Sequence, residues 1–245
     1  KVLVVEGNEK AAKKLKISGG GKCNITNVSV TPHNYLGDEE LVESIFSQFS
    51  KDDLLLWLQK RGLTPVVRKD QYYFCPKSAD EIISILARAS RKSTYLFNQK
   101  IRSLIKSDCF ELTTEKGRFK AKKVVIATGA KSFAILGASE IGLELARHFG
   151  HSVKPFAPAL AGLTLQAKEF WMKALSGISF PAEVSVDDKI LLEDMLLTHR
   201  GLSGPVILSA SLYWSRGEIS INFLPGTALR ELMHNNRKLL STALP

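Results

Sequence analysis

A run of three glycines flanked by polar side chains is the strongest sign of a binding site in this sequence. Glycine has no Cβ, so the backbone of such a run can approach a flat ring or a phosphate closely. Successive backbone N–H groups can also form a concave site for an anion. A flexible loop is the alternative, but the hydroxyl and amide neighbours favour ligand contact. The candidate ligand-binding residues of this block are Ser18, Gly19, Gly20, Gly21, Lys22, Asn24 and Thr26.

An acidic residue directly follows the first apolar run of the chain. Residues 2–5 are all apolar, which predicts a buried parallel strand, and Glu6 comes next. In a dinucleotide-binding βαβ unit, a carboxylate at the end of the second strand accepts hydrogen bonds from ribose hydroxyls. The glycine turn of such a unit lies about 20 residues earlier, so we expect it upstream of Lys1. A surface glutamate after a strand is the alternative.

A second apolar run ends in a small polar turn. Residues 124–127 predict another parallel strand, and Thr128, Gly129 and Ala130 follow it. In doubly wound folds, ligands bind outside the carboxyl ends of the strands. These three residues are therefore candidate cofactor contacts, and a plain strand-terminating turn is the alternative.

One histidine lies in a compact polar block near a helix start. Residues 198–205 read Thr-His-Arg-Gly-Leu-Ser-Gly-Pro, with Pro205 at the expected first helical position. His199 could act as a general acid or base near neutral pH, although a structural role is the more ordinary one. Ser203 lacks the five-residue nucleophile elbow of hydrolases, so we expect it to cap the helix.

The cysteines and the other histidines do not suggest a metal site or a disulfide. Cys23, Cys75 and Cys109 are widely spaced and odd in number. The dithiol of a disulfide reductase would need a second cysteine about five residues after Cys23, where Val28 stands, so we expect Cys23 to be a buried thiol. A reducing cytoplasm fits this cysteine usage best.

Composition describes an ordinary globular chain with a strong positive charge. The 245 residues are 44% hydrophobic and 24% charged, with a net charge of +10. No apolar run reaches the roughly 18 residues of a membrane-spanning helix. The charge fits an anionic cofactor, a nucleic acid or a solvated lysine-rich surface, and does not separate them.

Local signals predict several helices and strands. Helices are expected over residues 38–49 and 50–62, from 78 onward, over 139–149, after Pro205 and over 229–240. A hairpin is expected over residues 109–121 and a strand over 218–224. Composition shifts after His151 toward proline-punctuated strands, so we place a boundary near residue 152.

Four collinear motifs resemble a bacterial flavoprotein family, the aminoacetone-oxidase-like and BaiN-like NAD(P)/FAD-dependent oxidoreductases. The first runs from Glu6 through the glycine block to Asn27. The others are residues 124–129, 158–160 and 197–205. The resemblance implies an α/β fold of the glutathione-reductase type, a two-dinucleotide-domain flavoprotein. A Rossmann-like FAD-binding domain would span residues 1–152, an inserted β-rich domain 153–226, and the start of a helical subdomain 227–245.

The resemblance also implies roles for individual residues. Glu6 would bind the ribose, the glycine block would lie along the pyrophosphate and flavin, and the lysines of positions 10–22, Lys13 among them, would face phosphates. Thr128 and Gly129 would sit near the flavin, and Ile101 would offer its backbone to adenine. This chain departs from the family in having Lys22 for arginine, which loses the fork geometry, and Ala130 for glycine. The family's N-terminal glycine turn and C-terminal flavin segment are expected outside the given sequence.

The leading hypothesis is an FAD-dependent oxidoreductase acting on a small organic substrate, with NAD(P)H as a possible electron donor. An amine or amino-ketone and a conjugated enone both stay open as substrates. We expect a cytoplasmic enzyme with no membrane or metal and, given the absence of a nucleic-acid motif, no nucleic acid. The alternatives are a basic nucleic-acid-binding protein on a flavoprotein scaffold and a non-catalytic flavin-binding module.

Overall fold

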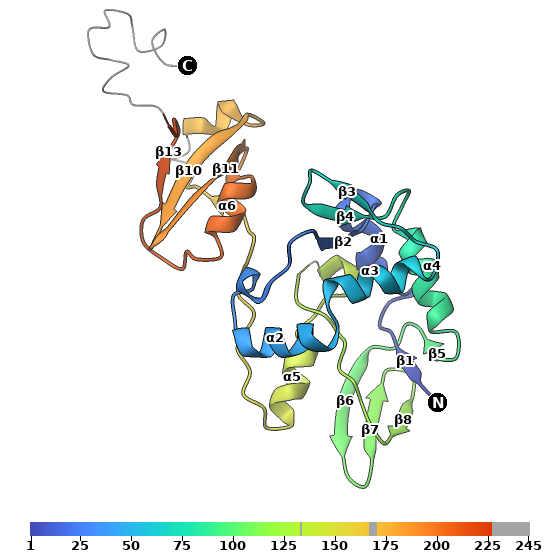
Figure 1. Ribbon diagram of the computed structural model, residues 1–245. Coiled ribbons are helices and arrows are strands. Elements are labelled where there is room, and N and C mark those ends of the chain that lie inside the picture. Colours follow the sequence, from blue (N-terminus) through green and yellow to red (C-terminus); the bar gives the residue numbers. More distant parts are fainter. Residues whose placement is uncertain (133, 167–170, 227–245) are drawn as a thin grey trace, which may run out of the picture. The chain divides into compact units, whose positions relative to one another are not determined.

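The chain forms two compact units in the computed structural model (Figure 1), which describes residues 1–132, 134–166 and 171–226. The N-terminal unit is Lys1–Lys154 and the C-terminal unit is Pro155–Pro245. The division falls two residues after the boundary expected from composition. The predicted helix over 229–240 and the subdomain from 227 onward lie outside the described residues.

The N-terminal unit begins with a short parallel sheet. Strand β1 (Leu3–Val5) pairs with β5 (Thr94–Leu96), and the N–H of Glu6 extends the pairing to the carbonyl of Leu96 at 2.9 Å. The parallel strand is as predicted, but it is not buried, since Leu3 is 42% exposed. Among the described residues β1 has a partner on one edge only, which leaves its apolar side chains uncovered.

A second, antiparallel sheet supports the glycine loop. Helix α1 (Lys13–Ile17) leads into the 3₁₀ turn η1 (Ser18–Gly21) and strand β2 (Asn24–Asn27). Strand β2 pairs with β4 (Tyr72–Phe74), which pairs with β3 (Val66–Arg68). This sheet was not among the expected elements, because strands of three residues are too short to show an alternating pattern.

Three helices form the rest of this part of the unit, each beginning near its predicted cap. Asp38 accepts the N–H of Leu41 at 3.0 Å at the start of α2 (Glu39–Gln48), which follows the 3₁₀ turn η2 (Pro32–Asn34). Ser50 and Asp53 form the predicted capping box of α3 (Lys51–Gln59). Helix α4 (Asp80–Ala89) follows Ser78. A core of buried side chains joins α3 and α4 to the segments around the glycine loop and β4: Cys23, Leu58, Leu63, Cys75, Ala79, Ile82 and Ile85.

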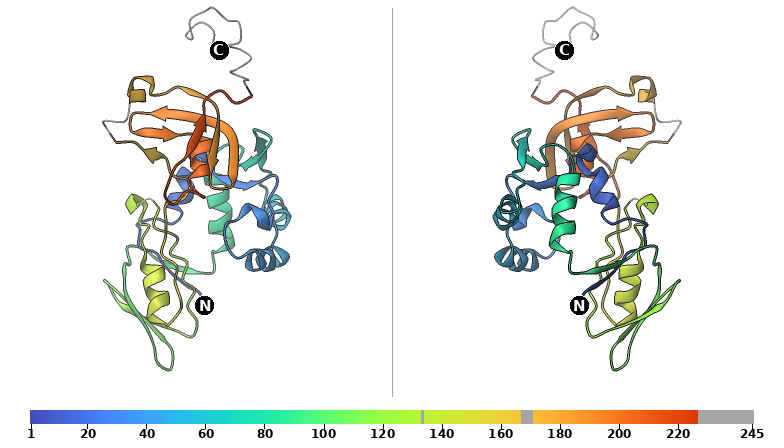
Figure 2. Two further views of the ribbon diagram at one scale, coloured as in Figure 1. Left: turned by 90° about the vertical axis from the view of Figure 1, so that its left-hand side faces the viewer. Right: turned by 90° about the vertical axis from the view of Figure 1, so that its right-hand side faces the viewer.

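The predicted hairpin is part of a three-stranded antiparallel sheet, here called the meander. Its strands are β6 (Ile101–Lys106), β7 (Phe110–Thr114) and β8 (Arg118–Ala121), in that order. Helix α5 (Ile141–His148) follows the 3₁₀ turn η3 (Ala134–Leu136) and packs beside β6, as Figures 1 and 2 show. The rings of Phe110 and Phe149 meet edge to face at 5.9 Å.

The strand predicted over residues 124–127 is wrong. This segment has no strand pairing, and Val125 is 87% exposed. Val124 and Ile126 instead line an apolar pocket of about 420 Å³ with meander residues and the end of α5. A strand exists only through hydrogen bonds to a neighbour, and the described residues place no strand beside this segment.

The C-terminal unit is a five-stranded antiparallel sheet with one helix against it. The sheet order is β13-β10-β11-β12-β9. The bounds are β9 (Leu163–Thr164), η5 (Trp171–Leu175), β10 (Ser179–Val186), β11 (Lys189–Thr198), β12 (Gly201–Ser203), α6 (Pro205–Ala210) and β13 (Ser220–Asn222). The core lies between α6 and the sheet, with Val184, Met195, Val206 and Ile207 fully buried.

Two expectations for this unit are confirmed and one is corrected. Pro205 begins α6, and the strand expected over 218–224 exists as the shorter β13. Ser203 is not the cap: it ends β12, and Gly204 with φ of 88° takes the N-cap position. In all described residues, no helix is both long enough and apolar enough to cross a membrane.

Candidate functional site

The three glycines of the loop divide into one that packs and two that are open. A Cβ on Gly19 would lie 2.7 Å from the backbone nitrogen of Asn24 and 2.7 Å from the Phe74 ring. A Cβ on Gly20 would meet nothing within 4 Å, and one on Gly21 would meet only the carbonyl of Lys16 at 4.0 Å. All three have positive φ, which favours glycine. The fold therefore needs Gly19, while Gly20 and Gly21 leave space for a ligand to approach the backbone.

Backbone hydrogen bonds join the glycine loop to the segment that leads into α4. The N–H of Ala79 donates to the carbonyl of Gly21 at 2.8 Å, and that of Cys75 to Lys22 at 3.0 Å. Within the loop, the N–H of Cys23 donates to the carbonyl of Ser18 at 2.9 Å. These bonds fix the loop in one conformation rather than leaving it a flexible connection, so its open side is preformed.

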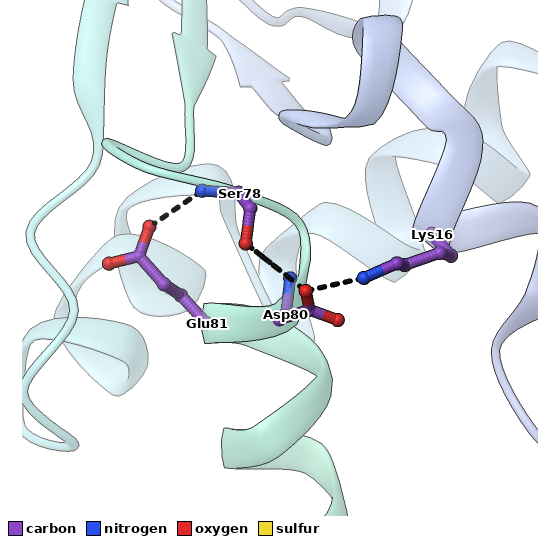
Figure 3. A network of polar contacts seen from close by, with 4 residues as sticks. All are labelled: Lys16, Ser78, Asp80 and Glu81. Carbon is purple, nitrogen blue, oxygen red and sulfur yellow. Dashed lines mark hydrogen bonds and ion pairs between the residues drawn. The ribbon is translucent and has the colours of Figure 1, made fainter.

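An ion pair adds a side-chain link between the same two segments. Figure 3 shows the Lys16 ammonium, on α1, reaching the carboxylate of Asp80 at the start of α4. The hydrogen bond from Lys16 lowers the pKa of Asp80. Beside it, the Glu81 carboxylate accepts the N–H groups of Lys77 and Ser78 at 2.8 and 3.3 Å. Both charged side chains of the pair are more than half exposed, so the pair orients α1 more than it stabilises the fold.

Glu6 is half-buried at the end of β1, and its carboxylate is already oriented. Its Oε1 accepts the backbone N–H of Asn8 at 2.8 Å and the Asn8 side-chain amide at 3.1 Å. The same Asn8 amide donates to the carbonyl of Leu136 at 3.0 Å. A Cβ on Gly137 would lie 2.7 Å from that amide, so glycine is required there. Asn8 thus joins the end of β1 to residues 134–137.

Helix α1 reaches the same region through its lysines. Lys14 Nζ donates to the hydroxyl of Ser132 at 2.7 Å, and Lys13 Nζ lies 3.6 Å from Glu9 Oε1. The predicted contact Lys13 is thus on the helix that leads into the glycine loop. Its side chain is 33% exposed.

The predicted turn after residues 124–127 also borders this region. The Thr128 hydroxyl lies 2.5 Å from where a Cβ on Gly142 would stand, so the turn runs against α5. Gly129 has φ of 73°, and Ala130 is exposed. The structure therefore brings the end of β1, α1 and residues 128–137 together, although 124–127 forms no strand.

The other predicted cofactor contacts lie within or beside their own secondary-structure elements. Ile101 begins β6 just after Gln99, whose N–H donates to the carbonyl of Glu6 at 3.0 Å. The Ser18 hydroxyl donates to the carbonyl of Leu15 at 2.8 Å, which makes it part of the turn. Asn24 is exposed and Thr26 half-exposed on β2, and Lys22 is half-buried beside them.

The block around His199 forms a tight hairpin in the C-terminal unit. Strands β11 and β12 pair with Thr198 opposite Gly201, which leaves His199 and Arg200 exposed in the turn. The Thr198 hydroxyl accepts the N–H of Gly201 at 3.1 Å and donates to its carbonyl at 3.0 Å. A Cβ on Gly201 would lie 2.1 Å from the carbonyl of Leu163. Much of this motif is therefore explained by the turn itself.

Several residues that organise the region were not predicted from the sequence. Asn8, Ser132 and Leu136 contribute its cross-links, and of these only Asn8 lay inside a quoted motif. Cys75 packs in the same core as Cys23 behind the glycine loop, and burial raises its pKa to about 11. Among the described residues no cluster of three or more His, Cys, Asp or Glu could hold a metal ion.

The family comparison confirms the predicted Rossmann-like α/β fold. Residues 1–230 match the family described as HI0933-like protein Rossmann domain, and the chain belongs to that family. This confirms the flavoprotein family to which the motifs pointed.

Three curated relatives extend the comparison. Two are named ribosomal RNA dihydrouridine synthase: one from Escherichia coli, 32% identical over 244 residues, and one from Haemophilus influenzae, 31% identical over 240. The matches cover 97% and 94% of this chain and 61% and 60% of those proteins. A 3-dehydro-bile acid delta(4,6)-reductase from Clostridium scindens is 27% identical over 240 residues, 91% of this chain and 58% of its own length. The chain thus spans about three-fifths of these relatives.

Proposed function

We propose that this chain is the larger part of an FAD-dependent reductase that saturates a carbon–carbon double bond conjugated to a carbonyl group. The observation that carries the proposal is the glycine loop, in which a Cβ on Gly20 would meet nothing within 4 Å and one on Gly21 only the carbonyl of Lys16. The carboxylate of Glu6, oriented by Asn8 at the end of β1, supports it. Family membership supports a dinucleotide as the ligand.

The residues present suit FAD. Glu6 Oε1 is held by Asn8, and a carboxylate has acceptor capacity left for ribose hydroxyls. Gly20 and Gly21 allow the backbone to approach the pyrophosphate, where the lysines of α1 contribute positive charge. Thr128, Gly129 and the backbone of Ile101 border the same region and complete the proposed binding set. Bound flavin would supply the two-electron chemistry, and the protein would supply binding and orientation.

The names of the relatives favour a reductase over an amine oxidase. Dihydrouridine is uridine whose C5–C6 double bond, conjugated to the C4 carbonyl, has been reduced. A 3-dehydro-Δ4,6 bile acid has a 3-oxo group conjugated to its C4 and C6 double bonds. Both names describe the addition of a hydride and a proton across an activated double bond. NADH or NADPH is proposed as the two-electron donor.

A uracil base in RNA is the first candidate substrate, in place of the expectation of no nucleic-acid partner, and a small cyclic enone is the second. The two relatives above 30% identity are the ones named for ribosomal RNA. The whole net charge of this chain also lies in the N-terminal unit, which holds 26 of the 34 lysines and arginines and 16 of the 24 acids. A steroid enone gives no reason for such a charge, whereas RNA phosphates do.

The test uses the full-length protein. We expect an oxidised-flavin absorption spectrum that bleaches when NADH or NADPH is added without air. The reduced protein should then be reoxidised by a uridine-containing RNA and more slowly by a 3-oxo-Δ4 steroid. A Gly20→Val variant should lose flavin while keeping its melting behaviour close to that of a Gly62→Val control, since Gly62 also has positive φ and open surroundings. A protein that neither contains nor takes up FAD would contradict the proposal.

A further inference from the structure

Half of the net positive charge of the N-terminal unit lies in and around one sheet, the meander. Residues 155–245 hold eight basic and eight acidic residues, so they contribute no net charge. Within the N-terminal unit, residues 100–123, which contain the meander, hold eight basic and three acidic residues. The eight basic side chains are all exposed: Lys100, Arg102, Lys106, Lys116, Arg118, Lys120, Lys122 and Lys123.

The two faces of the meander differ in character. Across the three strands, Leu104 pairs with Leu112 and Leu112 with Phe119, and this face is turned inward, with Leu104 3% exposed. The adjacent positions put Ile105, Glu111 and Lys120 in line on the opposite, outer face, because side chains alternate along a strand. Thr113 and Arg118 pair on this outer face as well, whereas Lys106 pairs with Phe110 on the inner face.

Internal ion pairs neutralise only a small part of this charge. Lys120 Nζ lies 2.8 Å from Glu111 Oε1, and Arg102 pairs with Glu115 at 2.5 Å. Within the part of the chain that the structure describes, the other six basic residues of the meander form no ion pair. Exposed lysines and arginines that lack partners are free to exchange small counterions for the phosphates of a polyanion.

We propose that the exposed cations in and around the meander bind the phosphate backbone of RNA. The proposal rests on the proposed function, since it names the surface that would hold the RNA substrate. Charge complementarity carries it: six exposed cations without an ion pair lie on the meander strands, in the turn between β7 and β8 or directly beside the strands, while residues 155–245 have no net charge. Short polar side chains, Ser103 and Thr113, lie on the outer face with Arg118 and can contact phosphate or sugar oxygens.

RNA fits this surface of the meander and its turns better than a membrane does. Membrane-surface segments combine cations with several aromatic or aliphatic side chains that enter the lipid. Among the described residues of the meander strands, Ile105 is the one large apolar side chain that is strongly exposed, at 48%. Contacts made by lysines and arginines to phosphates carry no base information, so we expect this surface to set affinity and leave base selection elsewhere.

The test compares two quadruple variants of the full-length protein with equal loss of charge. The first changes meander residues: Lys116→Gln, Arg118→Gln, Lys122→Gln and Lys123→Gln. The control changes three exposed lysines and one exposed arginine elsewhere: Lys60→Gln, Lys154→Gln, Lys173→Gln and Arg216→Gln. Binding of a fluorescein-labelled RNA hairpin is followed by anisotropy between low and moderate salt.

We expect the meander variant to bind this hairpin roughly tenfold or more weakly at low salt, with a slope of log K against log salt shallower by about two to three. The control should stay within about twofold of the parent. Equal losses in both variants, or no binding by the parent protein, would overturn the proposal. Binding to vesicles of phosphatidylserine and phosphatidylcholine is measured with the same variants. If the meander changes weaken vesicle binding and leave RNA binding unchanged, the proposal is overturned and the surface is assigned to a membrane.

Flavin content and nicotinamide-driven bleaching are measured on the same samples. If both are normal while RNA binding is unaffected by the meander changes, this inference fails and the proposed reductase stands. If the parent protein has no flavin but the meander variant still loses RNA, the proposed function fails and the RNA-binding surface stands. The two failures are thus distinguishable.

Discussion

Asn8 donates two hydrogen bonds to the Glu6 carboxylate, from its backbone N–H at 2.8 Å and from its side-chain amide at 3.1 Å. The amide also bonds the carbonyl of Leu136, 128 residues further along the chain. The proposed ribose-binding carboxylate is therefore oriented by a residue that ties it to the loop opposite. Replacing Asn8 should change cofactor binding more than it changes the fold.

Asn8→Ala is expected to weaken FAD binding by roughly tenfold, because the Glu6 carboxylate loses the amide that orients it. The measurement is titration of the full-length apoprotein with FAD, followed by flavin fluorescence. Gln59→Ala, at an exposed amide at the end of α3, serves as the matched control and should bind like the parent. Equal affinity in the Asn8 variant would show that Glu6 needs no such support.

Gly19 and Gly20 should respond differently to the same alanine substitution. Both have positive φ, so each change costs about 1 kcal/mol of backbone strain. Gly19→Ala adds a contact of 2.7 Å with the Phe74 ring and the Asn24 backbone, so its melting temperature should fall well below that of Gly20→Ala. Gly20→Ala should instead lower FAD affinity. Similar melting temperatures for the two variants would argue against the packing role of Gly19.

The capping box of α3 should make stability depend on pH in acid. Hydrogen bonds from Ser50 hold the pKa of Asp53 below its ordinary value of 3.8. A lowered folded-state pKa contributes stability above the ordinary value, and this contribution is lost as pH falls through the folded-state pKa. Asp53→Asn should therefore lower the melting temperature at pH 7, and the difference from the parent should shrink below about pH 3.8. Asp52→Asn, on the preceding residue, is the control.

The three cysteines should differ strongly in reactivity. Cys23 and Cys75 are buried, and burial raises the pKa of Cys75 to about 11, so its thiol stays protonated at pH 8. Cys109 is half-exposed and should react first with iodoacetamide, as read by peptide mass spectrometry. All three should react once the protein is unfolded. Early labelling of Cys75 in the native protein would mean that the segment behind the glycine loop opens readily.

Signals that depend on neighbouring residues were predictable from the sequence, and pairings between distant segments were not. Asp38 and Ser50 cap helices within three residues of themselves, so their pattern is visible directly. Residues 124–127 have the composition of a strand, but composition does not supply the partner that a strand requires. The link from Asn8 to Leu136 and the pairing of β2 with β4 join segments far apart in sequence and leave no local periodicity.

In the turn at residues 198–201, Gly201 is required by packing, whereas His199 is a candidate for chemistry. A Cβ on Gly201 would stand 2.1 Å from the carbonyl of Leu163 on β9, so Gly201→Ala must displace one strand of the sheet. We expect it to lower the melting temperature of the C-terminal unit by several degrees, because overpacking costs about 1–3 kcal/mol.

His199 is exposed in the same turn, so His199→Gln should leave that melting temperature unchanged. If His199 donates the proton in the proposed reduction, its variant should lower the rate of reoxidation by substrate. If the His199→Gln variant is fully stable and its reoxidation rate is unchanged, residues 198–201 serve only to turn the chain between β11 and β12.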